Sequence, residues 1–279
     1  MNIGVDLGGT KVRVGIVDDG RILKILSEET KSGGSEEEVL GQLEGMLAAC
    51  VSDCSGAIGI GVPAIVDPAT GVVRDVVAIP SWKEVPLKSI LEKQFSRPVS
   101  VNNDCNCFAL GECRYGKAAE YSKAVYVTLG TGVGCSLVVD GHLYGGANLG
   151  AGELGNVPYL DKDYEFYCSS RFFESKGFSG KGLADKAGSG DAAALKIWDE
   201  FGGHIGRLVA LVCYAYDPEA IVFGGSIAKA FEYFEGGMRR CLDEHFLYPN
   251  SLSRLAILTS EQDNMGLIGA SLIAEDSIK

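Results

Sequence analysis

The chain has 279 residues, of which 46% are hydrophobic, and this length is typical of about two globular domains with sizeable cores. Its 37 acidic residues outnumber its 25 Lys and Arg residues, and the net charge of −12 disfavours duplex DNA and anionic membranes as partners. Neither a membrane-spanning apolar run of ~18 residues nor a signal peptide is recognisable, and nine scattered cysteines are typical of reduced thiols in the cytoplasm.

Short apolar runs alternate with longer segments of helical periodicity, and this alternation predicts an α/β fold. In the first half, Asp18-Asp19-Gly20 is a tight-turn signal, and Ser35 with Glu38 fits a capping box that opens a helix. The strands expected in this half cover residues 3–6, 12–17, 22–27, 57–62 and 99–103.

The second half predicts a hairpin, a long helix and one more buried strand. The hairpin covers 124–130 and 135–139, and Asp191 is expected to cap the long helix. The apolar strand 220–223 leads into Gly224-Gly225-Ser226, after which another helical pattern begins.

Two segments of the chain match each other at a constant offset. Leu7-Gly8-Gly9-Thr10 corresponds to Leu129-Gly130-Thr131-Gly132, and both copies are expected to form strand, glycine turn and strand. The identical pairs are Val5/Val127, Leu7/Leu129, Gly8/Gly130, Val17/Val139 and Asp18/Asp140. Such a duplication predicts two similar domains that face each other and could hold a phosphate chain from both sides.

The first glycine turn carries groups suited to phosphate. Gly8 and Gly9 allow the backbone to approach an anion closely, while Thr10 offers a hydroxyl and Lys11 a cation. Asp6 would face the metal ion of a nucleotide through water. An ordinary hairpin turn is the alternative, and the matching second glycine turn favours the phosphate interpretation.

A polar cluster follows the apolar strand that ends near Val101. Asp104 stands where open α/β sheets place their ligands, and its carboxylate could accept a proton from an attacking hydroxyl. Asn102 and Asn103 could bind polar substrate edges. The alternative is that Asp104 and Asn106 merely cap the following helix.

Two further glycine-rich segments are candidates for binding. Glu153 lies between glycines in 150–156 and could bind a substrate, or could be a solvated loop acid. Gly224 and Gly225 could let an adenine or ribose approach the backbone, or could form a plain strand-to-helix turn.

The ordered set of these segments resembles the ROK family (repressors, open reading frames and sugar kinases) of the actin-like ATPase and sugar kinase superfamily. The matching segments are 6–11, 61–63, 101–104 with Gly111-Glu112, 130–134, 151–153 and 223–228. The resemblance implies two actin-like, ribonuclease H-like α/β domains with a cleft between them, at 1–118 plus 262–279 and at 119–261. It also implies ATP-dependent phosphorylation of a sugar hydroxyl, usually O6 of a hexose, with Mg²⁺ on the nucleotide, and a homodimer.

The resemblance assigns roles by motif. It makes Asp104 the catalytic base, and Asn103 and Glu153 sugar ligands. It makes Gly8 to Lys11 and Thr131-Gly132 the two phosphate loops, and Gly224-Gly225 part of the nucleotide pocket.

One region departs from the family pattern. Asn156 stands where many members have a His, and Cys168 is the one thiol near the place of their Cys-rich zinc loop, so we expect no structural zinc. Glu165 matches the family's third sugar carboxylate if the gap falls before it, and Glu174 is the competing candidate. The side chains expected to hold this loop by packing are Pro158, Tyr159, Leu160 and Tyr164.

Glucose is the first substrate expected. Ala64 and Ala78 stand where the family often has Gly and Asn, so fructose, mannose, an N-acetylhexosamine or a glycoside remain open as substrates. A sugar-responsive repressor would carry a helix-turn-helix ahead of the kinase-like part, whereas the first strand here begins near Met1. A non-catalytic sugar sensor is disfavoured because Asp104 and both glycine turns are present.

Overall fold

The computed structural model describes residues 1–276 and divides into two compact units. The first unit contains Met1–Ala119, Gly145–Ala151 and Gln262–Lys279, and the second contains Glu120–Tyr144 and Gly152–Glu261. The expected domain limits, 1–118 with 262–279 and 119–261, stay a prediction, and residues 277–279 lie outside the described residues.

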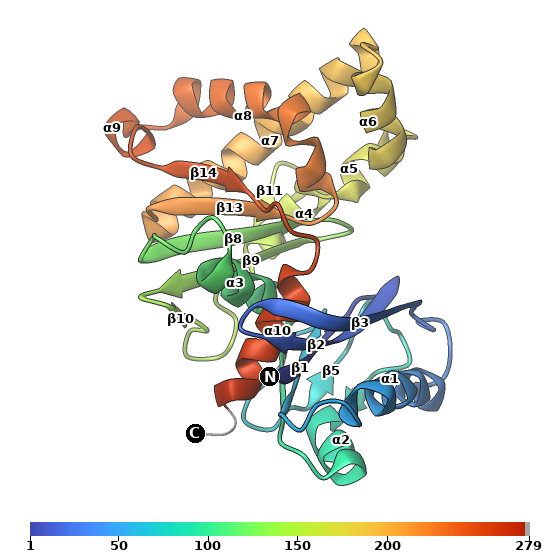
Figure 1. The fold of residues 1–279 in the computed structure, drawn as a ribbon. Helices are drawn as coiled ribbons and strands as arrows, with labels where there is room; N and C mark the ends of the chain where they lie inside the picture. Colours follow the sequence, from blue (N-terminus) through green and yellow to red (C-terminus); the bar gives the residue numbers. More distant parts are fainter. Residues whose placement is uncertain (277–279) are drawn as a thin grey trace. The chain divides into compact units, whose positions relative to one another are not determined.

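The first unit is built on a five-stranded sheet in the order β3-β2-β1-β4-β7 (Figure 1). β1 pairs antiparallel with β2, and β2 with β3, whereas β4 runs parallel to both β1 and β7. All five strands were expected, and their bounds are Asn2–Leu7 (β1), Lys11–Asp18 (β2), Arg21–Glu29 (β3), Ile58–Val62 (β4) and Val99–Asn103 (β7).

The two faces of this sheet differ because side chains alternate along each strand. Ile3 and Val5 point into the core that α1 (Glu36–Val51) and α2 (Leu87–Phe95) complete. On the other face, an added Cβ at Gly4 or Gly59 would overlap carbonyl oxygens of α10 (Met265–Asp276). The strands therefore carry glycine where the last helix of the described chain packs directly on them, beside α3 (Asp104–Tyr115).

The capping box predicted for α1 is confirmed. Ser35 Oγ accepts a hydrogen bond from the Glu38 backbone N–H at 3.3 Å, and the Glu38 side chain accepts from the Ser35 N–H at 2.8 Å. A small two-stranded sheet of β5 (Val73–Arg74) and β6 (Glu84–Val85) completes the first unit.

The second unit repeats the strand plan of the first. Its sheet has the order β10-β9-β8-β13-β14, with antiparallel pairs on the β9 side of β8 and parallel pairs on the β13 side. The bounds are Lys123–Leu129 (β8), Val133–Val139 (β9), His142–Leu143 (β10), Ala220–Gly224 (β13) and Ala256–Thr259 (β14). The duplication inferred from a few identities is therefore visible as a repeated topology.

Helices α7 (Ala192–Tyr216) and α8 (Phe231–His245) pack on each other and carry Trp198, Phe201 and Phe234 into the core of this unit. Asp191 caps α7 as expected and accepts hydrogen bonds from two backbone N–H groups. The remaining short elements are η1 (Leu154–Asn156), β11 (Pro158–Tyr159), β12 (Lys162–Asp163), α4 (Tyr164–Cys168), α5 (Ser170–Ser175), α6 (Gly180–Gly188), η2 (Ile227–Ala230) and α9 (Pro249–Leu252).

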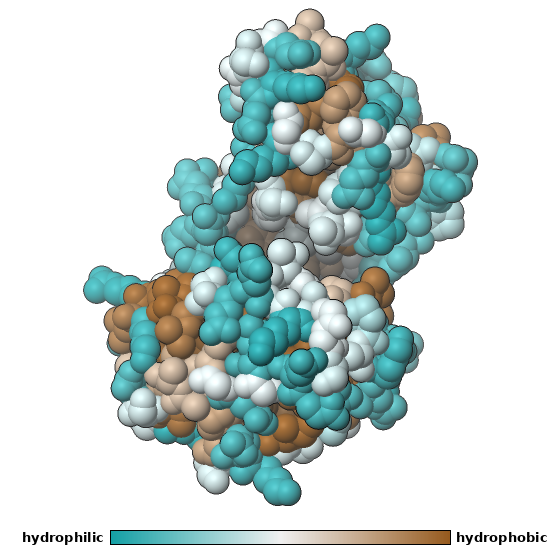
Figure 2. Space-filling model, turned by 90° about the vertical axis from the view of Figure 1, so that its right-hand side faces the viewer, coloured by the Kyte–Doolittle hydropathy of each residue, from teal (hydrophilic) through white to brown (hydrophobic). Residues whose placement is uncertain are grey.

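Hydrophilic residues cover much of the face drawn in Figure 2, with smaller apolar areas among them. Within residues 1–276, no helix combines the length and apolar character needed to cross a membrane.

Candidate active site

The first glycine turn joins β1 to β2. The Gly8 backbone N–H donates to the Lys11 carbonyl at 2.9 Å, which closes the turn, and the Thr30 hydroxyl donates to the Gly8 carbonyl at 2.7 Å. Gly9 and Thr10 lie at the tip, and Thr10 and Lys11 are exposed. The structure therefore brings the expected phosphate-loop residues together in one turn with its hydroxyl and ammonium groups open to solvent.

Asp6 lies on β1 directly opposite Arg13 of β2. Its Oδ2 atom is 3.1 Å from Arg13 Nη1, and Arg13 also reaches the carbonyl of Asp263 at 3.5 Å. Burial raises the pKa of Asp6 above its ordinary value, and the attraction of Arg13 offsets part of that increase. Arg13 was missed in the sequence, although the hairpin register already pairs positions 6 and 13.

Asn103 caps α3 at the end of β7. Its Oδ1 atom accepts hydrogen bonds from the backbone N–H groups of Cys105 at 2.8 Å and Asn106 at 3.2 Å. Asn103 is therefore the N-cap residue, and Asp104 Oδ1 also accepts from the Cys105 backbone N–H at 2.8 Å, so a capping contribution of Asp104 beside its proposed role stays open. Asp104 is the first residue of α3, where the N-terminal end of the helix favours a carboxylate.

The side-chain amides of Asn102, Asn103 and Asn106 connect the end of β7 to the first turn of α3. Asn102 Oδ1 accepts from the Asn103 backbone N–H at 2.8 Å and from Asn106 Nδ2 at 2.9 Å. Asn103 Nδ2 donates to the Ala64 carbonyl at 3.2 Å. Because the Asn103 oxygen already accepts two hydrogen bonds, this side chain can offer a ligand a donor more readily than an acceptor.

The second glycine turn, between β8 and β9, occupies the same place as the first and is one residue shorter, because Leu129 pairs with Val133 whereas Leu7 pairs with Val12. The Gly130 N–H donates to the Gly132 carbonyl at 3.0 Å, and the Ser170 N–H donates to the Gly130 carbonyl at 2.8 Å. An added Cβ at Gly130 would meet nothing within 4 Å, whereas one at Gly132 would lie 2.6 Å from Glu165 Oε2. One side of this turn is therefore open, and the other is covered by a carboxylate.

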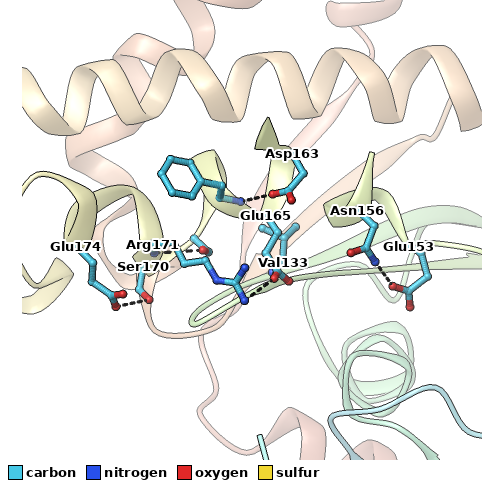
Figure 3. Close-up of polar contacts among 10 residues, drawn as sticks. Val133, Glu153, Asn156, Asp163, Glu165, Ser170, Arg171 and Glu174 are labelled. Carbon is cyan, nitrogen blue, oxygen red and sulfur yellow. Dashed lines mark hydrogen bonds and ion pairs between the residues drawn. The ribbon is translucent and has the colours of Figure 1, made fainter. Parts of the chain in front are cut away.

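Glu153 and Asn156 form a pair on the turn η1. Asn156 Nδ2 donates to Glu153 Oε2 at 2.9 Å, and both side chains are exposed while the residues between them are buried (Figure 3). The pair therefore presents one carboxylate and one amide together at the surface of the second unit.

Glu165 is the second residue of α4 and lies beside the second glycine turn. Its Oε1 atom is 2.9 Å from Arg171 Nη2, and its Oε2 atom accepts from the Val133 backbone N–H at 3.4 Å. Glu174 instead accepts from the Ser170 hydroxyl at 2.8 Å, and Figure 3 shows it on the side of Arg171 away from Glu165. Of the two competing carboxylates, Glu165 is therefore the one beside the second glycine turn. Its ion-pair partner Arg171 was not anticipated from the sequence.

Gly224 and Gly225 lie next to the same turn. Gly225 has φ +86°, and an added Cβ would overlap the carbonyl oxygen of Leu129, the residue before Gly130. Only glycine combines this backbone conformation with so close an approach. Packing of the second unit therefore already explains the glycine at this position.

The segment between Asn156 and Glu165 is held by aromatic rings. Tyr159 stacks on Tyr164 with ring centroids 4.4 Å apart. Pro158 is exposed and Leu160 is 69% exposed, so the expectation that these two side chains contribute packing is wrong. Within residues 1–276, no group of three or more His, Cys, Asp or Glu side chains is arranged to hold a metal ion. The absence of structural zinc stays a prediction.

Comparison with known proteins places the chain in a family. The model of the ROK family matches residues 2–277. The chain belongs to the ROK family. Among ROK relatives, a glucokinase of Thermotoga maritima is 31% identical over 99% of this chain and 98% of that protein. An N-acetyl-D-glucosamine kinase of Pasteurella multocida is 29% identical over 88% of this chain and 90% of that protein.

A solved ROK structure agrees with the fold. The ROK family glucokinase from Streptomyces griseus, determined in complex with glucose and AMPPNP, has a TM-score of 0.86 and 26% identity, with 99% of each chain covered. The expected fold class, α/β with two domains of actin-like topology, is confirmed.

Proposed function

We propose that this chain, an ATP-dependent sugar kinase of the ROK family, transfers the γ-phosphoryl group of ATP to O6 of glucose or a closely related hexose. The observation that carries the proposal is the placement of Asp104 at the junction of β7 and α3, where three Asn side chains fix the backbone around it. The carboxylate takes the proton of the sugar hydroxyl while that oxygen forms its bond to phosphorus and the bond to ADP breaks.

The two glycine turns hold the phosphates of ATP. Thr10 and Lys11 supply a hydroxyl and a cation from the first turn, and the backbone around Thr131 and Gly132 supplies the second. Gly224 and Gly225 border the nucleotide. Both turns are closed by internal hydrogen bonds, so their backbone N–H groups are preorganised.

Mg²⁺ fits this site as a companion of the nucleotide. Mg²⁺ is commonly bound by one or two carboxylates together with water and substrate phosphates, and it neutralises phosphate charge when bound. Asp6 is the carboxylate beside the first turn, and its ion pair with Arg13 favours contact through water over direct ligation.

Four polar side chains are the proposed ligands of the sugar. Asn103 donates a hydrogen bond, and Glu153 with its partner Asn156 accepts and donates at neighbouring hydroxyls. Glu165 is the third carboxylate, a choice supported by its position against Val133 and Arg171.

A panel of sugars tested by coupled ADP release decides the substrate. Glucose turnover with formation of glucose 6-phosphate supports the proposal, and the Asp104→Asn variant controls for contaminating kinases. Sugar binding without turnover by the wild type would instead identify a sensor.

An N-acetylhexosamine or a glycoside is a second candidate substrate. Val77 is 86% exposed and Ile65 is 54% exposed, and their neighbours Ala78 and Ala64 contact Gly9 and Asn103. Ile65, which follows the Ala64 carbonyl that Asn103 contacts, is an exposed apolar side chain that suits an acetyl methyl or an apolar aglycone. A kcat/KM for such a sugar above that for glucose would select this candidate.

A homodimer is the proposed assembly, supported by the family resemblance and tested by light scattering of the eluted protein. The net charge of −12 supports the absence of nucleic-acid and membrane partners, and the nine scattered cysteines support a cytoplasmic location; both stay predictions.

A further inference from the structure

The short hairpin β11–β12 separates the two candidate sugar ligands of the second unit. Asn156 ends η1 just before the hairpin, and Glu165 follows Tyr164 just after it. The Tyr164 N–H donates to the Val157 carbonyl at 3.1 Å and closes the base of the hairpin. Both candidate ligands are therefore joined directly to the base of this hairpin.

Tyr159 anchors the hairpin to α7. Its hydroxyl lies 3.2 Å from His204 Nδ1, and its ring stacks on Tyr164 and meets the edge of Tyr167 at 5.4 Å. Tyr167 also packs against the His204 ring at 4.7 Å. We define Tyr159, Tyr164, Tyr167 and His204 as the aromatic anchor.

The partner of the hairpin is a helix of the second unit that is packed into its core. His204 lies in the middle of the 25-residue helix α7, whose neighbouring side chains Phe201 and Ile205 are fully buried. The Tyr167 hydroxyl donates to the Asp161 carboxylate at the tip of the hairpin. The aromatic anchor therefore contacts the hairpin at its tip as well as at its base. The Phe172 ring of α5 lies edge-on to the His204 ring, with ring centroids 5.3 Å apart.

The protonation states suit this contact. Burial raises the pKa of Tyr159 to about 12, and burial lowers the pKa of His204 below its ordinary value. Both groups are therefore neutral near neutral pH, and the tautomer of the imidazole sets which of them donates the hydrogen bond between the Tyr159 hydroxyl and His204 Nδ1.

We propose that the aromatic anchor is a positioning element for the kinase reaction, which sets Asn156 and Glu165 for the sugar by fixing the β11–β12 hairpin to α7. The inference rests on the proposed sugar-binding roles of Asn156 and Glu165. The anchor residues touch neither reactant, and their effect reaches the sugar through the backbone of the hairpin. Their loss should weaken sugar binding and leave ATP binding nearly unchanged.

The test compares Michaelis constants for sugar and ATP in matched variants. Tyr159→Ala should raise the KM for sugar by about 10- to 100-fold, the range expected when ligating groups shift by about an ångström. Its KM for ATP should stay within about twofold of the wild type. Tyr159→Phe keeps the ring stack and loses the hydrogen bond, so it should recover most of the sugar affinity.

Tyr214→Ala is the matched control. Tyr214 also lies on α7 and also forms an aromatic cluster, with Phe246 and Tyr248, but it is about three helical turns from His204. This variant should leave both Michaelis constants unchanged.

Glu165→Gln separates the two ways in which the inference could fail. An unchanged sugar KM in Glu165→Gln would overturn the proposed sugar site itself. A raised sugar KM in Glu165→Gln together with a sugar KM within threefold of wild type in folded Tyr159→Ala would overturn the anchor alone. Equal rises in the KM for sugar and ATP would also overturn it.

If Tyr159→Ala does not fold, Tyr159→Phe and His204→Phe decide the question. Each removes one side of the Tyr159–His204 hydrogen bond and keeps a ring, and each should raise the sugar KM at least twofold. Because both remove the same contact, the double variant should be no worse than the more affected single variant. Unchanged sugar KM values in both single variants would overturn the proposal.

Discussion

Gly130→Ala tests whether the second glycine turn holds phosphate, because the fold itself leaves room for the change. An added Cβ at Gly130 meets nothing within 4 Å, and its backbone is outside the left-handed region. Replacing such a glycine by alanine stabilises a protein by about 0.4–1 kcal/mol through the unfolded chain. Folding should therefore be unharmed.

If the proposed function holds, the same methyl group would lie beside the phosphates that Thr131 and Gly132 bind. Loss of one hydrogen bond to a charged group costs about 1.5–3 kcal/mol, which corresponds to roughly a 10- to 150-fold higher KM for ATP. Coupled ADP release at saturating sugar measures this constant, and thermal unfolding measures stability. Gly45→Ala on α1, where an added Cβ also meets nothing within 4 Å, is the control for stability without a kinetic effect. A KM for ATP within twofold of wild type in a stable Gly130→Ala protein would refute the phosphate role.

Three further predictions use the same assays. Asp104→Asn should lower kcat by about 10²–10⁴-fold with sugar affinity nearly kept, and retention of more than about a tenth of kcat would exclude Asp104 as the base. Lys11→Ala should raise the KM for ATP about 10-fold or more and leave the KM for sugar unchanged, since its ammonium is exposed at the first turn, and equal effects on both would contradict this role. Elemental analysis should find no stoichiometric zinc after dialysis, and activity restored by zinc but not by Mg²⁺ after chelation would contradict that expectation.

Local patterns in the sequence were sufficient for the five strands of the first sheet and for β8, β9 and β13 of the second, whereas β10, β14 and α10 were not anticipated. Residues 99–103 were expected as a strand and form β7, and the Ser35–Glu38 capping box opens α1 as expected. These features depend on neighbours within a few residues, so alternation and cap chemistry predict them. The repeated strand plan was also accessible, because the glycine turns occupy the same place in both copies.

The partners of the candidate site residues were harder to predict. Arg171 reaches Glu165, and His204 reaches Tyr159 from a helix far along the chain. Such contacts depend on how elements pack, which periodicity does not encode. Gly225 shows the opposite case, because a motif considered for nucleotide binding has a sufficient reason in its close approach to Leu129.

Asp6→Asn should separate stability from activity. The folded-state pKa of Asp6 is raised above the ordinary value of 3.8, so the ionised form that prevails near neutral pH is less favourable in the folded protein than in the unfolded chain. The stabilising contribution of this group is complete below about pH 4 and is lost as the pH rises through the raised pKa. Removing the charge should therefore increase the free energy of unfolding at neutral pH by about 0.5–2 kcal/mol, and the increase should disappear near pH 4.

Arg13 supplies the control, because it offsets part of the burial cost of Asp6. Arg13→Met leaves the carboxylate without this partner and should lower stability at neutral pH by about 1–3 kcal/mol, whereas the change should be nearly neutral in the Asp6→Asn background. Asp6→Asn should at the same time weaken the dependence of the rate on Mg²⁺ concentration. A loss of stability at neutral pH on Asp6→Asn would show that the attraction of Arg13 exceeds the cost of burying the Asp6 charge. The carboxylate would then stabilise the β1–β2 hairpin, whatever its part in nucleotide binding.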